Sequence, residues 1–200
     1  MRWLTPEDLS QIYGTPAPAS TRKVADQLTD AYRAHIQRAR FCILSTVGPE
    51  GTDASPRGDD GPVVLELDAQ TLALPDWRGN DRIDSLHNIA RDDRASLMFM
   101  VKGSGNVIRI NGRARITDDA DLCARFTRDG KQPRTVIVIR IAEVYFQCAR
   151  AVIRANLWSG EDDSAGLPTP GQILASLTEN EVGGDAYDTA WPQRAAQTMW

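Results

Sequence analysis

Apolar runs in the middle of the chain are short and bounded by turn formers, which predicts strands rather than long helices. The run 41–47 is almost continuously apolar and is typical of a buried strand. A turn at 48–51 leads into a second strand that ends near Ser55, so the two are expected to form a hairpin. The same signals predict further strands at 63–67, 72–74, 94–102, 107–116 and 136–146.

The clearest period of two lies in the strand predicted at 107–116. Apolar or small residues alternate there with arginine and asparagine: Ile108, Ile110, Gly112, Ala114 and Ile116 against Arg109, Asn111, Arg113 and Arg115. Such alternation predicts that one face packs on a core while the other faces water or an anion. Alternation alone favours a solvated outer face, because it requires no ligand.

Helices are predicted to be few and short. One is expected over 25–39, where apolar residues recur at four-residue spacing, and a second over 81–91. A third is expected around Leu122, capped by Thr117 and Asp118. Six or seven strands with few helices indicate a mainly β (α+β) fold built on an antiparallel barrel.

The composition changes after residue 160. A loop at 162–171 precedes a helix through Ile173, Leu174 and Leu177, and a polar segment follows. We therefore divide the chain into a barrel domain with an N-terminal helix, 1–160, and a C-terminal helical extension, 161–200. The extension is too short for a core of its own, so we expect it to pack on the barrel or on a partner subunit.

Composition and charge narrow the classes of function. The 200 residues are 42% apolar and 25% charged, with a formal net charge of −4, so neither nucleic acid nor an anionic membrane surface is an expected partner. The three cysteines are widely spaced among apolar residues, which predicts buried reduced thiols and no metal site. With no apolar signal segment, the protein is expected to be soluble and cytoplasmic.

Candidate chemistry is concentrated in three nearby segments: Ser55 to Asp59, Leu74 to Asp76 and Gly79 to Ile89. They combine turn formers, arginines and short hydroxyl or amide side chains between strand-like runs. A phosphate-bearing planar cofactor requires such donors, and Arg57 and Arg82 are the best phosphate anchors because a guanidinium can bind two oxygens at once.

Each of these residues also has a simpler interpretation. Arg57 could pair with the neighbouring Asp59 or Asp60, and Asn80 with Asp81 could cap the following helix. The first turn of that helix could add the Ser85 hydroxyl and backbone N–H groups to a phosphate site, although its carboxylates would repel a phosphate placed too close.

These segments, with a fourth from Cys148 to Trp158, resemble motifs of the pyridoxamine 5′-phosphate oxidase-like split β-barrel superfamily. The resemblance covers roughly residues 30–160. Within this superfamily the chain is similar to an FMN-binding branch and not to the true pyridoxamine phosphate oxidases. Their Ser-Arg-Lys phosphate signature and their Arg-Leu-His ending do not occur in this chain. Oxidation of vitamin B6 is therefore not the expected activity.

The resemblance implies a six- to seven-stranded split barrel with flanking helices, and a homodimer that binds FMN between its subunits. Carried over onto this sequence, it implies a site with no metal and no assigned catalytic residue, made of Ser55, Arg57, Pro75, Asp76, Asn80, Arg82, Ser85, Asn88, Arg154 and Trp158. The corresponding function is an FMN-binding oxidoreductase acting on an unidentified small molecule. A deazaflavin-dependent reductase and a non-catalytic flavin- or haem-binding module are the alternatives.

Overall fold

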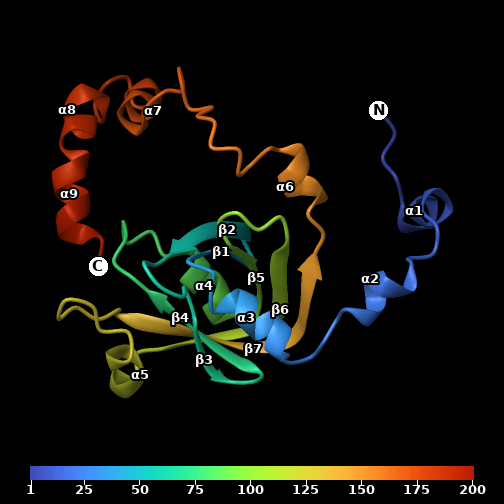
Figure 1. The fold of residues 1–200 in the computed structure, drawn as a ribbon. Helices are drawn as coiled ribbons and strands as arrows, with labels where there is room; N and C mark the ends of the chain where they lie inside the picture. The colour runs from blue at the N-terminus through green and yellow to red at the C-terminus, as the bar shows by residue number, and fades with distance from the viewer.

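A computed structural model describes residues 1–200, in which one seven-stranded antiparallel sheet forms the body of the protein (Figure 1). The sheet order is β2-β1-β5-β6-β7-β4-β3. The strands are β1 Phe41–Gly48, β2 Gly51–Gly58, β3 Leu65–Asp68, β4 Thr71–Asp76, β5 Arg94–Met100, β6 Val107–Thr117 and β7 Thr135–Gln147. The helices are α1 Pro6–Ile12, α2 Pro18–Arg22, α3 Asp30–Ile36, α4 Asp84–Arg91, α5 Ala120–Ala124, α6 Arg150–Arg154, α7 Pro170–Leu177, α8 Gly184–Thr189 and α9 Trp191–Thr198.

The sheet curls around a single apolar core. Leu44, Leu97, Ile110 and Ile139, from four different strands, are all essentially inaccessible to solvent. The end strands β2 and β3 are not paired with each other, so the barrel stays split on that side. The predicted mainly β split barrel with flanking helices is confirmed.

The period of two in β6 has the predicted consequence. Ile108, Ile110 and Ala114 are buried, whereas Arg113 and Arg115 are exposed. A bulge at Asn111 and Gly112 shifts the register against β7 without reversing the two faces. Alternation along this strand therefore predicted which side chains enter the core.

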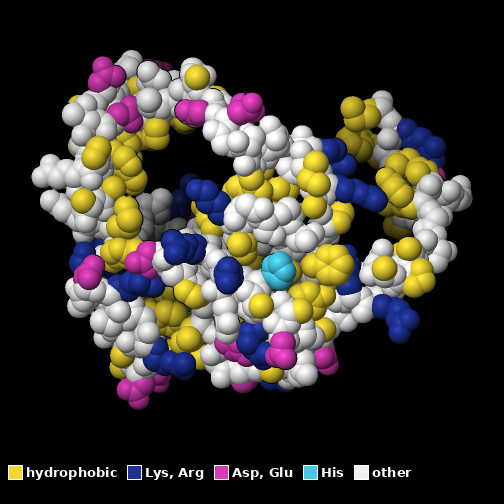
Figure 2. Space-filling model, in the orientation of Figure 1, with side chains coloured by type: hydrophobic (Ala, Val, Ile, Leu, Met, Phe, Trp, Pro, Cys, Tyr) yellow, Lys and Arg dark blue, Asp and Glu magenta, His cyan; other side chains and the backbone are white.

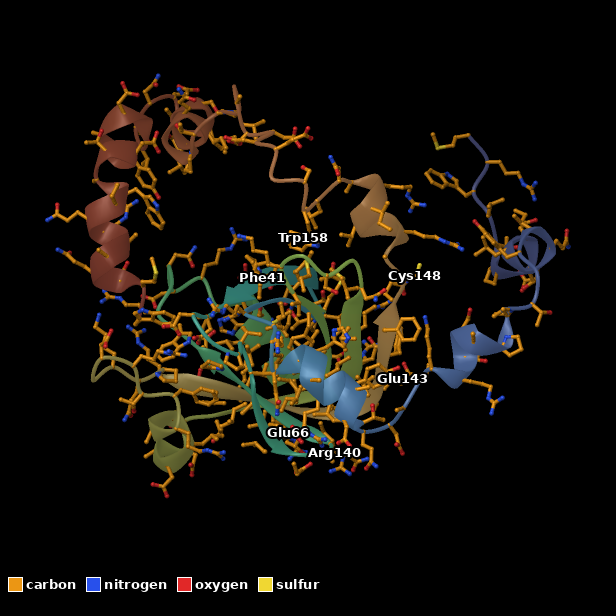
Figure 3. All side chains as sticks on the ribbon, viewed as in Figure 1. Phe41, Glu66, Arg140, Glu143, Cys148 and Trp158 are labelled. Carbon is orange, nitrogen blue, oxygen red and sulfur yellow. The ribbon has the colours of Figure 1, made fainter.

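The first helix of the barrel is shorter than predicted. The helix expected over 25–39 is α3, which begins only after Thr29, whose hydroxyl accepts a hydrogen bond from the Tyr32 N–H. Ala25 instead pairs with Val144 at the edge of the sheet. An ion pair of 2.8 Å between Arg33 and Glu66 ties α3 to β3 (Figure 3).

Two strands run further than predicted. The strand expected to end near Ser55 is β2, which continues to Gly58, and β4 includes Pro75 and Asp76. Proline is tolerated at position 56 because β2 is an edge strand, so one side of it needs no hydrogen-bond donor. Much of the predicted turn-rich chemistry therefore lies on strands.

Several local predictions are wrong. The helix α4 starts at Asp84 and not near residue 81, because Asp81 has a left-handed backbone with φ of 59°. The cap of α5 is Asp119, whose carboxylate accepts from the Leu122 N–H. Cys148 is exposed just beyond β7 (Figure 3), whereas the other two cysteines are buried as predicted.

Both ends of the chain lie outside the barrel. The segment with α1 and α2 extends to one side, and the three helices α7, α8 and α9 form an arc on the other (Figure 1). The sequence pattern did not predict α1, α2, α6, α8 or α9. No helix has both the length and the apolar character that crossing a membrane would require.

Candidate functional site

A cavity of about 1110 Å³ opens where the split in the barrel lies. Its walls come from β2, from the end of β4 and the loop that follows, and from the start of α4. The lining is completed by residues after β2 and from later in the chain: Asp59, Asp60, Val63, Arg134, Thr135, Met199 and Trp200. Seven of the predicted site residues line this one cavity: Ser55, Arg57, Pro75, Asp76, Asn80, Arg82 and Ser85.

An ion pair between Arg57 and Asp76 crosses the split. A guanidinium nitrogen of Arg57 donates to a carboxylate oxygen of Asp76 at 2.5 Å, and the side chains are only 17% and 20% exposed. Arg57 lies on β2 and Asp76 on β4, and β1, β5, β6 and β7 separate these strands in the sheet. The pair therefore joins the two ends of the curled sheet by side chains where backbone pairing is absent.

Arg57 does not pair with the aspartates next to it in the sequence. Asp59 and Asp60 both pair with Arg128, so the expectation of a local ion pair is wrong. The Arg57 Nε is buried and has no hydrogen-bond partner. The hydroxyl of Thr135, which is paired with Asp76 in the β4–β7 register, is also buried and without a partner. Such unpaired polar atoms are uncommon in proteins, and both of these belong to residues that line the cavity.

Asp59 holds the aromatic part of the cavity wall in place. Its side chain is 4% exposed, and its two oxygens accept from the indole N–H of Trp77 at 3.0 Å and from Arg128 at 2.6 Å. Trp77 in turn meets the ring of Trp200 edge-on, with centroids 5.2 Å apart. A buried carboxylate thus holds an aromatic wall in place.

The loop between β4 and α4 makes three contacts with arginines at the rim of the cavity. Asn80 accepts from the Arg82 N–H at 3.0 Å, so it forms a turn and does not cap α4, whose cap Ile83 has no side-chain bond. Arg82 pairs with Asp84 at 2.6 Å, and Arg134 pairs with Asp81 at 3.0 Å. Arg78 is the lining arginine without any carboxylate partner.

The two predicted residues of α4 have different surroundings. The Ser85 hydroxyl donates to Asp53 on β2 and lines the cavity. Asn88 is buried away from it and donates to the Thr46 hydroxyl on β1 at 3.2 Å. A side chain at Gly48 would collide with Asn88, since an added Cβ would lie 2.2 Å from the amide oxygen. Within one chain, Asn88 therefore attaches α4 to the barrel.

Arg154 and Trp158 do not line the cavity of their own chain. Arg154 ends α6 and is exposed, and the indole of Trp158 donates to the Ser104 carbonyl at 2.8 Å, which attaches this segment to the β5–β6 loop (Figure 3).

The cavity offers binding groups and no activated nucleophile. Its lining contains no histidine and no cysteine. Cys42, which pairs with Arg57 in the β1–β2 register, is buried, and burial raises the pKa of its thiol to about 12 against the opposing effect of Arg57. No group of three or more His, Cys, Asp or Glu side chains is placed to hold a metal.

Comparison with known proteins identifies the family. A family model described as pyridoxamine 5′-phosphate oxidase matches residues 28–148. The chain belongs to this family. The pyridoxamine 5′-phosphate oxidase superfamily is of flavin-binding oxidoreductase type, and the matched part contains β2, β4 and α4, which build most of the cavity. No curated protein matches the sequence.

Solved structures resemble this chain at low sequence identity. A variant of HupZ from Group A Streptococcus is 14% identical with a TM-score of 0.50, covering 60% of this chain and 98% of its own. General Stress Protein 26 from Bacillus anthracis is 18% identical with a TM-score of 0.43, covering 57% and 88%. An F420 reductase is 15% identical with a TM-score of 0.44, covering 60% and 98%.

Sequence reasoning missed part of the lining. Trp77 and Arg78 lie in the sequence directly between two of the recognised segments. This position could have identified them as lining residues. Thr135 and Trp200 reach the cavity through strand pairing and through the path of the extension, and no local pattern marks them. Trp200 lies outside the residues that match the family.

Proposed function

We propose that this protein is an FMN-dependent oxidoreductase that acts on a small molecule. The observation that carries the proposal is the cavity at the split, which is lined by four arginines and lies mostly within the part of the chain that matches the family. Its volume of about 1110 Å³ compares with roughly 300–1,000 Å³ for typical small-molecule sites. This supports room for a cofactor and for part of a substrate.

The donor set fits a phosphate-bearing ring. Arg57, Arg78, Arg82 and Arg134 would hold the phosphate, and Arg78 would do so without first leaving a carboxylate. The half-buried indole of Trp77 would lie against the ring. FMN, when bound, supplies the capacity to accept and donate hydride or electrons, and the residues of this chain bind and orient it.

We further propose that the working form is a homodimer. On the outer face of the sheet, Phe41 stands opposite Met100, and Ile43 stands opposite Met98. Phe41 is exposed and the other three are only half-buried in a single chain, so a second copy covering them would remove apolar surface from water. Arg154 and Trp158 would then complete the cavity of the partner subunit, which is consistent with their position outside their own.

The first experiment is a visible absorption spectrum of the purified protein, with mass spectrometry of the small molecule released on denaturation. We expect FMN. A deazaflavin would support the reductase alternative, and haem would support a binding module, although no histidine lines the cavity. A colourless protein that also fails to bind added FMN would overturn the proposal.

The second experiment tests the phosphate anchors. We expect Arg57→Ala combined with Arg82→Ala to weaken FMN binding on the order of a hundredfold, because charge-assisted hydrogen bonds contribute about 1.5–3 kcal/mol each. The matched control combines Arg91→Ala with Arg113→Ala, which removes two surface ion pairs outside the cavity. Wild-type affinity in the first double variant would show that these anchors are wrong.

A further inference from the structure

The C-terminal extension is attached to the barrel only weakly. Its helices bond to one another, as where the Gly171 N–H donates to Asp188 at 2.9 Å. Residues 162–200 make no hydrogen bond and no ion pair with residues 1–160. Figure 2 shows an open gap between this arc and the body of the molecule. The arc is therefore free along most of its length.

The far end of the arc returns to the cavity. Met199 and Trp200 both contribute to the lining. The Trp200 ring meets Trp77 at an interplanar angle of 79°, and the guanidinium of Arg128 lies 5.4 Å from its centroid. An edge-on ring pair and a single cation–π contact between half-buried side chains each contribute only about 0.5–2 kcal/mol, so this attachment can open and close.

The receiving surface on the barrel is held rigidly. Trp77 and Arg128 are both bound by the buried carboxylate of Asp59, which also accepts from the Gly61 N–H at 3.3 Å. The barrel side of the contact therefore keeps its position whether or not Trp200 is present. The contact therefore joins a fixed surface of the barrel to a loosely attached segment, which is the arrangement that a lid requires.

We propose that residues 162–200 form a lid over the cavity and that Trp200 is the residue that closes it. With Trp200 against Trp77 and Arg128, the lid blocks one exit and slows release of the bound molecule. The identity of that molecule rests on the proposed function, but the closure itself does not.

The direct test is the dissociation rate of FMN from the full-length protein. We expect Trp200→Ala to release FMN about five- to tenfold faster, and Trp200→Phe, which keeps an edge-on ring, to stay within about twofold of wild type. Trp191→Ala is the matched control, because that exposed tryptophan is on the same extension and does not line the cavity. Equal rates in Trp200→Ala and Trp191→Ala would overturn the lid.

A second test needs no cofactor. Ser55→Cys places a thiol in the cavity wall, and Cys148→Ser removes the exposed native thiol. We expect a maleimide reagent to label this reporter several-fold faster when Trp200→Ala is added, and at an unchanged rate when Trp191→Ala is added. An unchanged rate in both would overturn the lid. If wild-type protein binds no FMN, the proposed function fails, while this labelling experiment still decides whether the lid exists.

Discussion

Two walls of the same cavity are built in different ways. On the barrel side, Arg57 lies on β2, which pairs with β1, and Asp76 lies on β4, which pairs with β7. Their side chains bond to each other at 2.5 Å across the split. On the other side, Trp200 reaches the cavity from the segment 162–200, which makes no hydrogen bond to residues 1–160. The comparison separates a permanent part of the site, which the fold itself holds in place, from a part that can leave without unfolding the barrel.

The largest expected effect comes from breaking the permanent wall. Asp76→Asn leaves the Arg57 charge without its carboxylate in a mostly buried position, and we expect a loss of about 1–3 kcal/mol in the free energy of unfolding. Denaturant titration measures it. The control is Asp84→Asn, which breaks a pair whose side chains are 79% and 49% exposed, so we expect less than about 1 kcal/mol. Equal losses in the two variants would show that the Arg57–Asp76 pair stabilises the fold no more than an exposed ion pair does.

The two sides of the tryptophan contact should also differ in stability. Trp77→Ala removes a half-buried ring and leaves Asp59 without one of its donors, so we expect it to cost about 1–3 kcal/mol. Trp200→Ala removes only ring contacts at the end of the extension, and we expect less than about 1 kcal/mol. Thermal unfolding of the two variants measures the difference. A larger loss for Trp200→Ala would mean that the extension is part of the folded body.

A smaller effect concerns the thiols. Burial raises the pKa of Cys42 to about 12, so its thiol remains protonated between pH 7 and 9 and should not react with a thiol reagent. Cys123 is also buried, and burial raises its pKa, whereas Cys148 is exposed. We expect one reactive thiol per native chain and three in denaturant, counted by mass spectrometry. Labelling of Cys42 in the native protein would indicate that the strand behind Arg57 opens.

Sequence patterns singled out residues that the fold brings to one cavity, but they predicted the local structure of these residues less well. Ser55, Arg57, Asp76, Asn80 and Arg82 do lie around one cavity. The secondary structure of Arg57 and Asp76 was missed, because the proline and glycine near Arg57 are turn formers in isolation but are tolerated in β2, which is an edge strand, and because β4 runs through Pro75 to Asp76. Whether a strand is an edge strand depends on the order of the whole sheet, which no local pattern contains.

The pairing of charges was equally beyond local reasoning. Arg57 has aspartates two and three residues away, yet its partner is Asp76 on a strand from the other end of the sheet. Asn88 has a type and position expected of a ligand contact, but the packing of α4 on β1 directs it to Thr46. In both cases the partner comes from how the sheet curls, not from distance along the chain.

The sequence by itself determined the class of fold and singled out segments that line the cavity. Alternation along β6 and the apolar run in β1 specify strands with one buried face, and burial of apolar surface makes that pattern decisive. Only the tertiary structure decided which charges meet across the split and that Trp200 reaches the cavity from 123 positions beyond Trp77 in the sequence. Such contacts depend on long-range geometry, because side chains from distant segments become neighbours only after the sheet has curled and the extension has folded back.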